Sequence, residues 1–488
     1  MSVRHAAVWA MGGQYLSFAI QFATSVIISR YFMKPADVGL FSVALSAAMV
    51  AAVLQDFGLA RYISGLPAID GDAIARCSTM ALLFSFVVAG IIAASAWPMA
   101  HTYHQADLLP IMLIIAASYL FLPFMVVPSA LMSRQMNFRG LFVVGVGGAL
   151  TQGAVGLGLG ALGYKSFALA WATLACAAAR GGLAQMLRPA LPWPLRFDQV
   201  RPIVHAGARL TSLYGLGALG TRTPDMVVGK LISLLGAGLY SRANSLSDQF
   251  RMLISGAIGS VFYPAFARIR DRGEAPGPAY LRVVAGYTAV IWPGMAGLAL
   301  VARPIVHALY GEGWMGVAPL LSTIALTEIF LVSLPLHTDL PILFGRLNRL
   351  LVLNAADTAL SVALLAAGCR WGLEGAAASR VVYGAGWVLI YARFLYEIVG
   401  FDRQALFAIY AKSAVATLAA LAPIGAIYAF WLGPDAVGFG VLIPAVLAGV
   451  GLWGLALWGL RHPALDDLAG IAAQVAAPLW RRLARRAV

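Results

Sequence analysis

Charged side chains lie inside stretches of this sequence that are otherwise apolar, and they are the residues whose types could do chemistry. An arginine fork donates two parallel hydrogen bonds and stays charged when partly desolvated, so it suits phosphate and pyrophosphate groups. Ionisable groups in an apolar layer are costly and usually mark a water-filled cavity or a ligand. The residues expected to line such a ligand site are Arg222, Asp225, Arg242, Asp248, Arg251 and Arg380.

Internal ion pairing is the alternative reading of these charges. Arg222 with Asp225, and Asp248 with Arg251, stand three residues apart, a spacing at which side chains meet on one helix face. Ligand binding and internal pairing therefore both stay open for these residues. Arg180 lies near the end of its apolar stretch, and we expect it to reach toward the membrane surface.

Polar residues of two further kinds accompany the arginines. Gln14 and Gln21 recur with serines on one face of the first apolar stretch, so we expect them to line the same cavity. Acidic residues within the stretches are candidates for ion coupling, with a structural role as the alternative. These candidates are Asp225, Glu328, Asp339 and Asp357.

Motifs for catalysis are missing from the sequence. It has no glycine-rich phosphate loop, no metal-ligand spacing and no nucleophile motif. Cys77, Cys176 and Cys369 are far apart and predict no disulfide framework. We therefore expect no catalytic residue, cofactor or metal, and we predict that the chain is not an enzyme.

The amino-acid composition indicates that these residues lie in a protein surrounded by lipid. Of 488 residues, 61% are hydrophobic and 11% are charged, and the chain has 51 Gly and 24 Pro. Such a surface suits lipid, and Gly and Pro are frequent in membrane helices. The formal charge of +14 is explained by basic residues retained on the cytoplasmic side, and no nucleic-acid partner is expected.

Apolar windows predict an all-α polytopic membrane protein with about 14 transmembrane helices. Most basic residues outside the spans then fall on the side of the N-terminus, so both termini are expected to be cytoplasmic. The first apolar stretch is interpreted as a span and not as a cleaved signal. The predicted spans are residues 6–29, 37–56, 77–98, 108–131, 140–162, 166–187, 207–231, 237–264, 281–303, 315–343, 350–369, 373–396, 409–432 and 438–460.

An internal repeat relates the second and eighth predicted spans. Residues 38–44, VGLFSVA, match residues 237–243, AGLYSRA, at the start of each span. Six spans separate the copies, so the halves share one orientation and should be related by an axis along the membrane normal. Chance similarity between small-residue turns is the alternative.

The repeat predicts two six-helix bundles around a central cavity, followed by an appended pair of helices. The predicted domains are an N-terminal bundle at 1–187, a cytoplasmic linker at 188–206, a C-terminal bundle at 207–397, an extra helix pair at 398–464 and a basic amphipathic tail at 465–488.

Several short patterns resemble the polysaccharide transporter family of the multidrug/oligosaccharidyl-lipid/polysaccharide exporter superfamily, the Wzx-like and colanic-acid-exporter-like flippases. The resemblance extends over nearly the whole chain. The patterns are residues 56–59 (DFGL), 134–139 (RQMNFR), Asp225 with Gly229, residues 235–243 (LGAGLYSRA), 263–266 (YPAF) and 309–314 (LYGEGW).

The resemblance implies a function and partners. The cargo would be an undecaprenyl-pyrophosphate-linked oligosaccharide, moved from the cytoplasmic to the periplasmic leaflet of the inner membrane by alternating access for surface polysaccharide assembly. Membrane lipids, a polysaccharide polymerase and glycosyltransferases would be its partners.

Two rival functions remain. A drug or small-molecule exporter of the same superfamily would favour acidic over arginine-rich cavity residues, and such exporters usually have 12 spans. A polysaccharide polymerase or ligase would need a large periplasmic loop, and the longest predicted ones, 98–107 and 303–314, are too short to form a domain.

Overall fold

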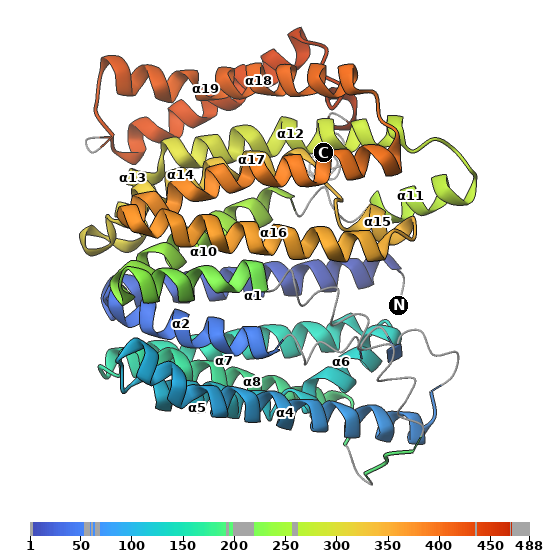
Figure 1. Ribbon diagram of the computed structural model, residues 1–488, viewed down its shortest axis with the longest axis vertical. Coiled ribbons are helices and arrows are strands. Elements are labelled where there is room, and N and C mark those ends of the chain that lie inside the picture. The colour runs from blue at the N-terminus through green and yellow to red at the C-terminus, as the bar shows by residue number, and fades with distance from the viewer. Residues whose placement is uncertain are drawn as a thin grey trace, which may run out of the picture. The chain divides into compact units, whose positions relative to one another are not determined.

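The chain folds into helices that run side by side (Figure 1). The computed structural model describes residues 3–52, 59, 62–63, 69–191, 195–198, 219–255, 262–434, 437–468 and 470. Within these ranges every regular element is a helix, so the predicted all-helical class is confirmed. Predicted features at residues 53–58, 199–218, 256–261 and 471–488 lie outside this part, including most of the tail.

Two compact units divide the chain. The first comprises Met1–Ser241 and Leu309–Gly313, and the second comprises Arg242–Ala308 and Trp314–Val488. The division falls inside the helix α10 (Leu234–Ser255). Each unit is described by itself below.

The first unit is built around α8, which packs against four neighbouring helices. A cluster of buried apolar side chains, among them Ile92, Ile111 and Ile115, joins helices of this unit. Residues 219–231 are also helical and belong to it. The helices are α1 (Val3–Tyr31), α2 (Pro35–Ala52), α4 (Gly71–Tyr103), α5 (Leu108–Tyr119), α6 (Pro123–Arg134), α7 (Phe138–Ala161) and α8 (Ser166–Leu187).

Small residues allow α1 and α7 to approach closely. A Cβ added at Gly153 would lie 2.8 Å from Thr24 Oγ1, and one added at Gly160 would lie 3.3 Å from Phe32 Cβ. Membrane helices pack through such small residues because lipid supplies no hydrophobic force between them.

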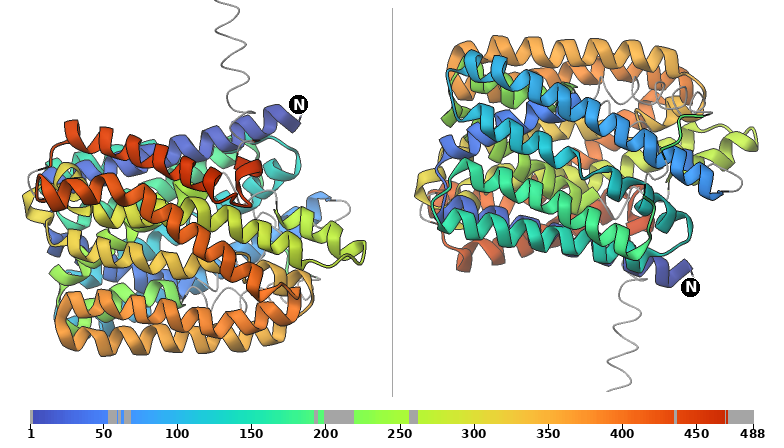
Figure 2. Two further views of the ribbon diagram at one scale, coloured as in Figure 1. Left: turned by 90° about the horizontal axis from the view of Figure 1, so that it is seen from above. Right: turned by 90° about the horizontal axis from the view of Figure 1, so that it is seen from below.

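The second unit contains the remaining helices, with α12 packed on α14 and α18. The pair α18 and α19 packs together, and its red ribbons are easily followed in Figures 1 and 2. The helices are α11 (Phe262–Asp271), α12 (Gly277–Leu300), α13 (Ala302–Tyr310), η2 (Glu312–Trp314), α14 (Val317–Ser333), α15 (Asp339–Leu343), α16 (Leu347–Gly368), η3 (Cys369–Trp371), α17 (Gly372–Val399), α18 (Arg403–Phe430) and α19 (Phe439–Gly459); α13 and η2 cross the division.

Two predicted spans are broken in the middle, which corrects their assignment as continuous helices. The span at 108–131 forms α5 and α6, bent by 40°. Pro123 would clash with the carbonyl of the residue four before it, and that residue, Tyr119, ends α5. The span at 315–343 stops at Ser333, and Leu336 in the gap has a positive φ of 59°.

Helix length and composition support a membrane location. In the described residues, eight helical stretches are long and apolar enough to cross a membrane, and nine if α5 and α6 count as one span. One stretch, Leu347–Val399, includes both α16 and α17, while the apolar α14 is shorter, at 17 residues. The chain is a multi-pass membrane protein.

Candidate functional site

The first polar network joins α2, residues 219–231 and the start of α10 within the first unit. Ser46 Oγ donates a hydrogen bond of 3.4 Å to Asp225 Oδ2, and Ser42 Oγ lies 3.0 Å from Ser241 Oγ. The Asp225 carboxyl group also hydrogen-bonds to the Ser241 side chain. Two helices, α2 and α10, thus supply hydroxyl groups to one half-buried carboxyl group.

Close contact between α2 and α10 brings these serines together. A Cβ added at Gly39 would overlap the Leu234 carbonyl oxygen, and one added at Gly238 would overlap that of Pro35. Only glycine allows this approach at either position. The contact is reciprocal. Pro35 meets Gly238, Gly39 meets Leu234, and Ser42 meets its counterpart in the repeat, Ser241.

The second network lies within the second unit and centres on Arg251. Its Nη2 donates to Asp248 Oδ1 at 3.1 Å, and its Nε lies 3.0 Å from Glu328 Oε2 on α14. Glu328 is only 7% exposed. The pairing of Arg251 with Asp248 expected from their spacing is therefore present, and sequence reasoning missed Glu328 as the second partner.

Arg380 holds together a third group of polar side chains, on α16 and α17. Its Nη1 donates to Ser361 Oγ at 2.7 Å, and its guanidinium carbon lies 4.4 Å from the centre of the Tyr383 ring. Tyr383 also hydrogen-bonds to Asp357. The hydroxyl of Tyr391 donates to Asn354 Oδ1 at 2.7 Å.

Aromatic packing surrounds His337, which lies in the break between α14 and α15. Its ring meets that of Trp387 edge-on at 4.8 Å and that of Tyr391 at 5.2 Å.

Other predicted site residues are placed apart from these networks. Arg222 is exposed, within electrostatic range of Asp225 and Tyr119. Gln14 and Gln21 are exposed on α1, and Asp339 is exposed at the start of α15. Arg242 is half-buried on α10.

Sequence reasoning did not single out the hydroxyl groups of Ser42, Ser46, Ser361 and Tyr383. Serine and tyrosine are common in apolar helices, and a single sequence does not show which of them faces a charge. A repeated serine, at 42 and 241, was the available signal.

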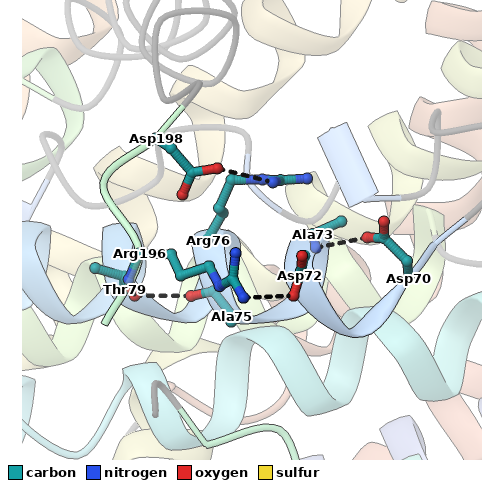
Figure 3. Close-up of polar contacts among 8 residues, drawn as sticks. All are labelled: Asp70, Asp72, Ala73, Ala75, Arg76, Thr79, Arg196 and Asp198. Carbon is teal, nitrogen blue, oxygen red and sulfur yellow. Dashed lines mark hydrogen bonds and ion pairs between the residues drawn. The ribbon is translucent and has the colours of Figure 1, made fainter. Parts of the chain in front are cut away.

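Ion pairs attach the predicted linker to the start of α4 (Figure 3). Arg76 Nη1 lies 3.2 Å from Asp198 Oδ2, and Arg196 Nη2 lies 3.1 Å from Asp72 Oδ1. The Arg196 backbone N–H also donates to Thr79 Oγ1 at 3.1 Å. The described part of the linker is therefore held against the first unit.

Comparison with solved structures defines the class of protein. The fold is similar to that of the lipid II flippase MurJ in an inward closed conformation, with a TM-score of 0.72 at 12% identity, covering 92% of this chain and 98% of MurJ. A multidrug resistance MATE family transporter of the MOP superfamily, in an inward-facing conformation, gives a TM-score of 0.62 at 14% identity, covering 82% of this chain and 96% of that chain. The class is therefore a polytopic membrane protein with the fold of these transporters.

Residues 27–319 match the polysaccharide biosynthesis protein family, and the chain belongs to that family. It is 23% identical over 349 residues to the succinoglycan biosynthesis transport protein ExoT of Rhizobium meliloti (strain 1021), covering 69% of this chain and 68% of ExoT. It is 22% identical over 305 residues to the lipopolysaccharide biosynthesis protein WzxC of Escherichia coli (strain K12), covering 60% of each.

These comparisons confirm the resemblance to polysaccharide transporters. ExoT is named a transport protein and MurJ a flippase, and neither name is that of an enzyme. The prediction that the chain is a transporter and not an enzyme agrees with them.

Proposed function

We propose that the protein is a flippase that moves undecaprenyl-pyrophosphate-linked oligosaccharide from the cytoplasmic to the periplasmic leaflet of the inner membrane. Its product would supply surface polysaccharide assembly, together with a polymerase and glycosyltransferases. The family match and the names of ExoT and WzxC support the polysaccharide pathway, and the fold supports transport.

One observation carries the choice of an anionic cargo: arginines lie inside α10 and α17, each held by side chains of its own or a neighbouring helix. Arg251 is fixed by Asp248 and Glu328, and Arg380 by Ser361 and the Tyr383 ring. Fixed guanidinium groups are pre-organised for the two oxygens of a phosphate. A charged group in an apolar layer is costly unless a counter-charge stabilises it. An anionic cargo would supply one to Arg380, whose hydrogen-bond partner Ser361 is neutral.

The proposed architecture follows the repeat. Two six-helix bundles at 1–187 and 207–397 would enclose a central cationic cavity, with the pair at 398–464 appended, about 14 helices in all. Alternating access would open the cavity to each side in turn. Both termini would be cytoplasmic.

Acidic groups would couple transport to an ion. Asp225 and Asp357 each hydrogen-bond to neutral hydroxyl groups, and Glu328 is bound to Arg251. Asp225 and Asp357 are the stronger candidates because, unlike Glu328, neither belongs to an ion pair found among the described residues. Asp339 remains a candidate at the break between α14 and α15.

Replacement of Arg251 tests the proposal. Arg251→Ala alone would leave the buried Glu328 unpaired, so the variant of choice is Arg251→Ala combined with Glu328→Gln. Surface polysaccharide from a host lacking the native gene should fall about tenfold or more, as expected for the loss of charge-assisted hydrogen bonds to cargo. Arg251→Lys should give a partial loss because lysine lacks the fork.

Arg272→Ala is the matched control, since Arg272 is 70% exposed in its side chain and pairs only loosely with Glu274, at 3.6 Å. It should leave polymer output unchanged. Membrane abundance is measured for every variant. Normal polymer output from the Arg251/Glu328 double variant would remove this arginine from the mechanism.

A further inference from the structure

Arg180 lies on α8, the helix at the centre of the first unit. Its Cγ and Nε pass directly over Gly148 of the neighbouring helix α7, where a Cβ would overlap both atoms. The position opposite Arg180 must therefore be glycine for the side chain to lie as it does.

The depth of this contact differs from the expectation that Arg180 reaches toward the membrane surface. Gly148 is ten residues into α7, which begins at Phe138, or about 15 Å along the helix at 1.5 Å per residue. The hydrocarbon core is about 30 Å thick, so the guanidinium group is held near mid-depth.

Nε of Arg180 is buried and has no hydrogen-bond partner among the residues that the structure describes. None of the ion pairs found in this part of the chain involves Arg180. Arg251 and Arg380 differ, since each has a polar partner on a neighbouring helix. A permanent charge held at mid-depth with an unused donor is costly, and a bound anion would lower that cost.

We propose that Arg180, seated over Gly148, is a phosphate-binding residue for the cargo in the first unit. The inference rests on the proposed function. The ligand chemistry is a phosphate or pyrophosphate group, which a prenyl-linked cargo, a free anion or an anionic phospholipid could each supply.

Binding to the purified full-length protein in detergent distinguishes these sources. The probes are farnesyl pyrophosphate, inorganic pyrophosphate and phosphatidylglycerol. Wild-type protein should bind farnesyl pyrophosphate, and inorganic pyrophosphate should compete for the site while phosphatidylglycerol should not. Competition by phosphatidylglycerol alone would assign Arg180 to a structural lipid and overturn the proposal.

Two variants and two controls isolate Arg180. Arg180→Ala should raise the Kd for farnesyl pyrophosphate about tenfold or more, since it removes charge-assisted hydrogen bonds. Gly148→Ala keeps the charge but displaces the side chain, and it should weaken binding as well. Gly158→Ala, on the same helix with open space around it, and Arg272→Ala, which removes an exposed charge, should bind as wild type does.

Thermal unfolding of each variant shows whether it is folded, and Arg180→Lys serves if Arg180→Ala is not. Unchanged binding by both Arg180→Ala and Gly148→Ala would overturn the inference and leave the proposed function standing. A wild-type protein that binds neither pyrophosphate probe would also overturn it. Only the further absence of any dependence of surface polysaccharide on this protein would remove the proposed function itself.

Discussion

His462 is a buried side chain, 2% exposed, at the end of the last described helix pair. The Ala464 backbone N–H donates to its Nδ1 at 3.2 Å, so Nε2 carries the proton and donates to Ser413 Oγ at 3.0 Å. Ser413 Oγ lies 2.9 Å from Thr288 Oγ1, which donates to the Val284 carbonyl. This chain of hydrogen bonds ties the residue after α19 to α18 and α12, and it requires a neutral imidazole.

Acid should therefore weaken the protein through His462. Burial, together with the nearby Lys412, lowers the pKa of His462 from 6.5 to about 4. Between pH 6.5 and about 4, His462 is protonated in the unfolded chain and neutral in the folded chain. The free energy of unfolding therefore decreases as the pH falls through this range. The unfolding temperature in detergent should drop over this range.

His462→Gln should reduce that dependence, because glutamine can hydrogen-bond to Ser413 without titrating. Its own unfolding temperature can be lower than that of the wild type at neutral pH, so the slope with pH is the quantity compared. An identical slope in both proteins would show that other groups govern acid sensitivity.

Contacts between residues close together in the sequence were predictable, and contacts between residues far apart in the sequence were not. Asp248 and Arg251 stand three residues apart on one helix, so helix geometry alone brought them together. Glu328 reaches Arg251 only because α14 packs near α10, which no spacing in the sequence encodes. The contact of Arg180 with Gly148 was missed for the same reason, since the two residues stand 32 positions apart.

At the scale of elements, the lengths of the apolar stretches predicted the positions and order of the helices. They did not predict where a helix is broken. The helix α8 coincides with its predicted span at 166–187. The breaks in the fourth and tenth spans were missed because apolar windows continue across them. Pro123 and Pro335 were visible signals, but proline is frequent enough in membrane helices that its presence alone does not predict a break.

The crossing of α2 and α10 should not tolerate a methyl group. Gly39→Ala and Gly238→Ala would each force a Cβ into a backbone carbonyl, and overpacking of this kind costs about 1 to 3 kcal/mol. Both variants should lower the unfolding temperature, whereas Gly12→Ala and Gly90→Ala, with nothing within 4 Å, should not.

Crosslinking reports the same contact directly. Ser42→Cys with Ser241→Cys, in a chain whose three native cysteines are replaced, should form a disulfide because the two hydroxyl oxygens lie 3.0 Å apart. Adding Gly39→Ala should reduce the yield. Equal yields, with unchanged unfolding temperatures, would show that the helices do not approach as closely as described.

For the whole molecule, the direction of the chain through the membrane is the prediction with the widest consequence. Asp70 and Asp107 are exposed beyond opposite ends of α4, which is 33 residues long. A cysteine at Asp70 should be labelled from the cytoplasm and one at Asp107 from the periplasm by a membrane-impermeant thiol reagent. The opposite pattern would reverse every assignment of side.

Charge asymmetry made a prediction of orientation possible, but the partition into compact units could not be obtained in this way. The described contacts group residues 219–241 with the first unit, although the repeat places them in the second half of the sequence. Contacts between distant helices decide such groupings, and they depend on the absence of a side chain at residues such as Gly39 and Gly238, which look ordinary in the sequence.

The crossing at Gly39 and Gly238 also bears on how the chain arose. Pro35 meets Gly238 just as Gly39 meets Leu234, and the counterparts in the repeat, Pro35 with Leu234 and Gly39 with Gly238, are each 199 positions apart. Reciprocity of this kind characterises the isologous interface of a two-fold homodimer. A shorter ancestor could have formed a dimer of two identical copies, both inserted in the membrane with the same orientation. The ancestral form of α2 in each copy would then have made this helix crossing before gene fusion joined the two copies in one chain.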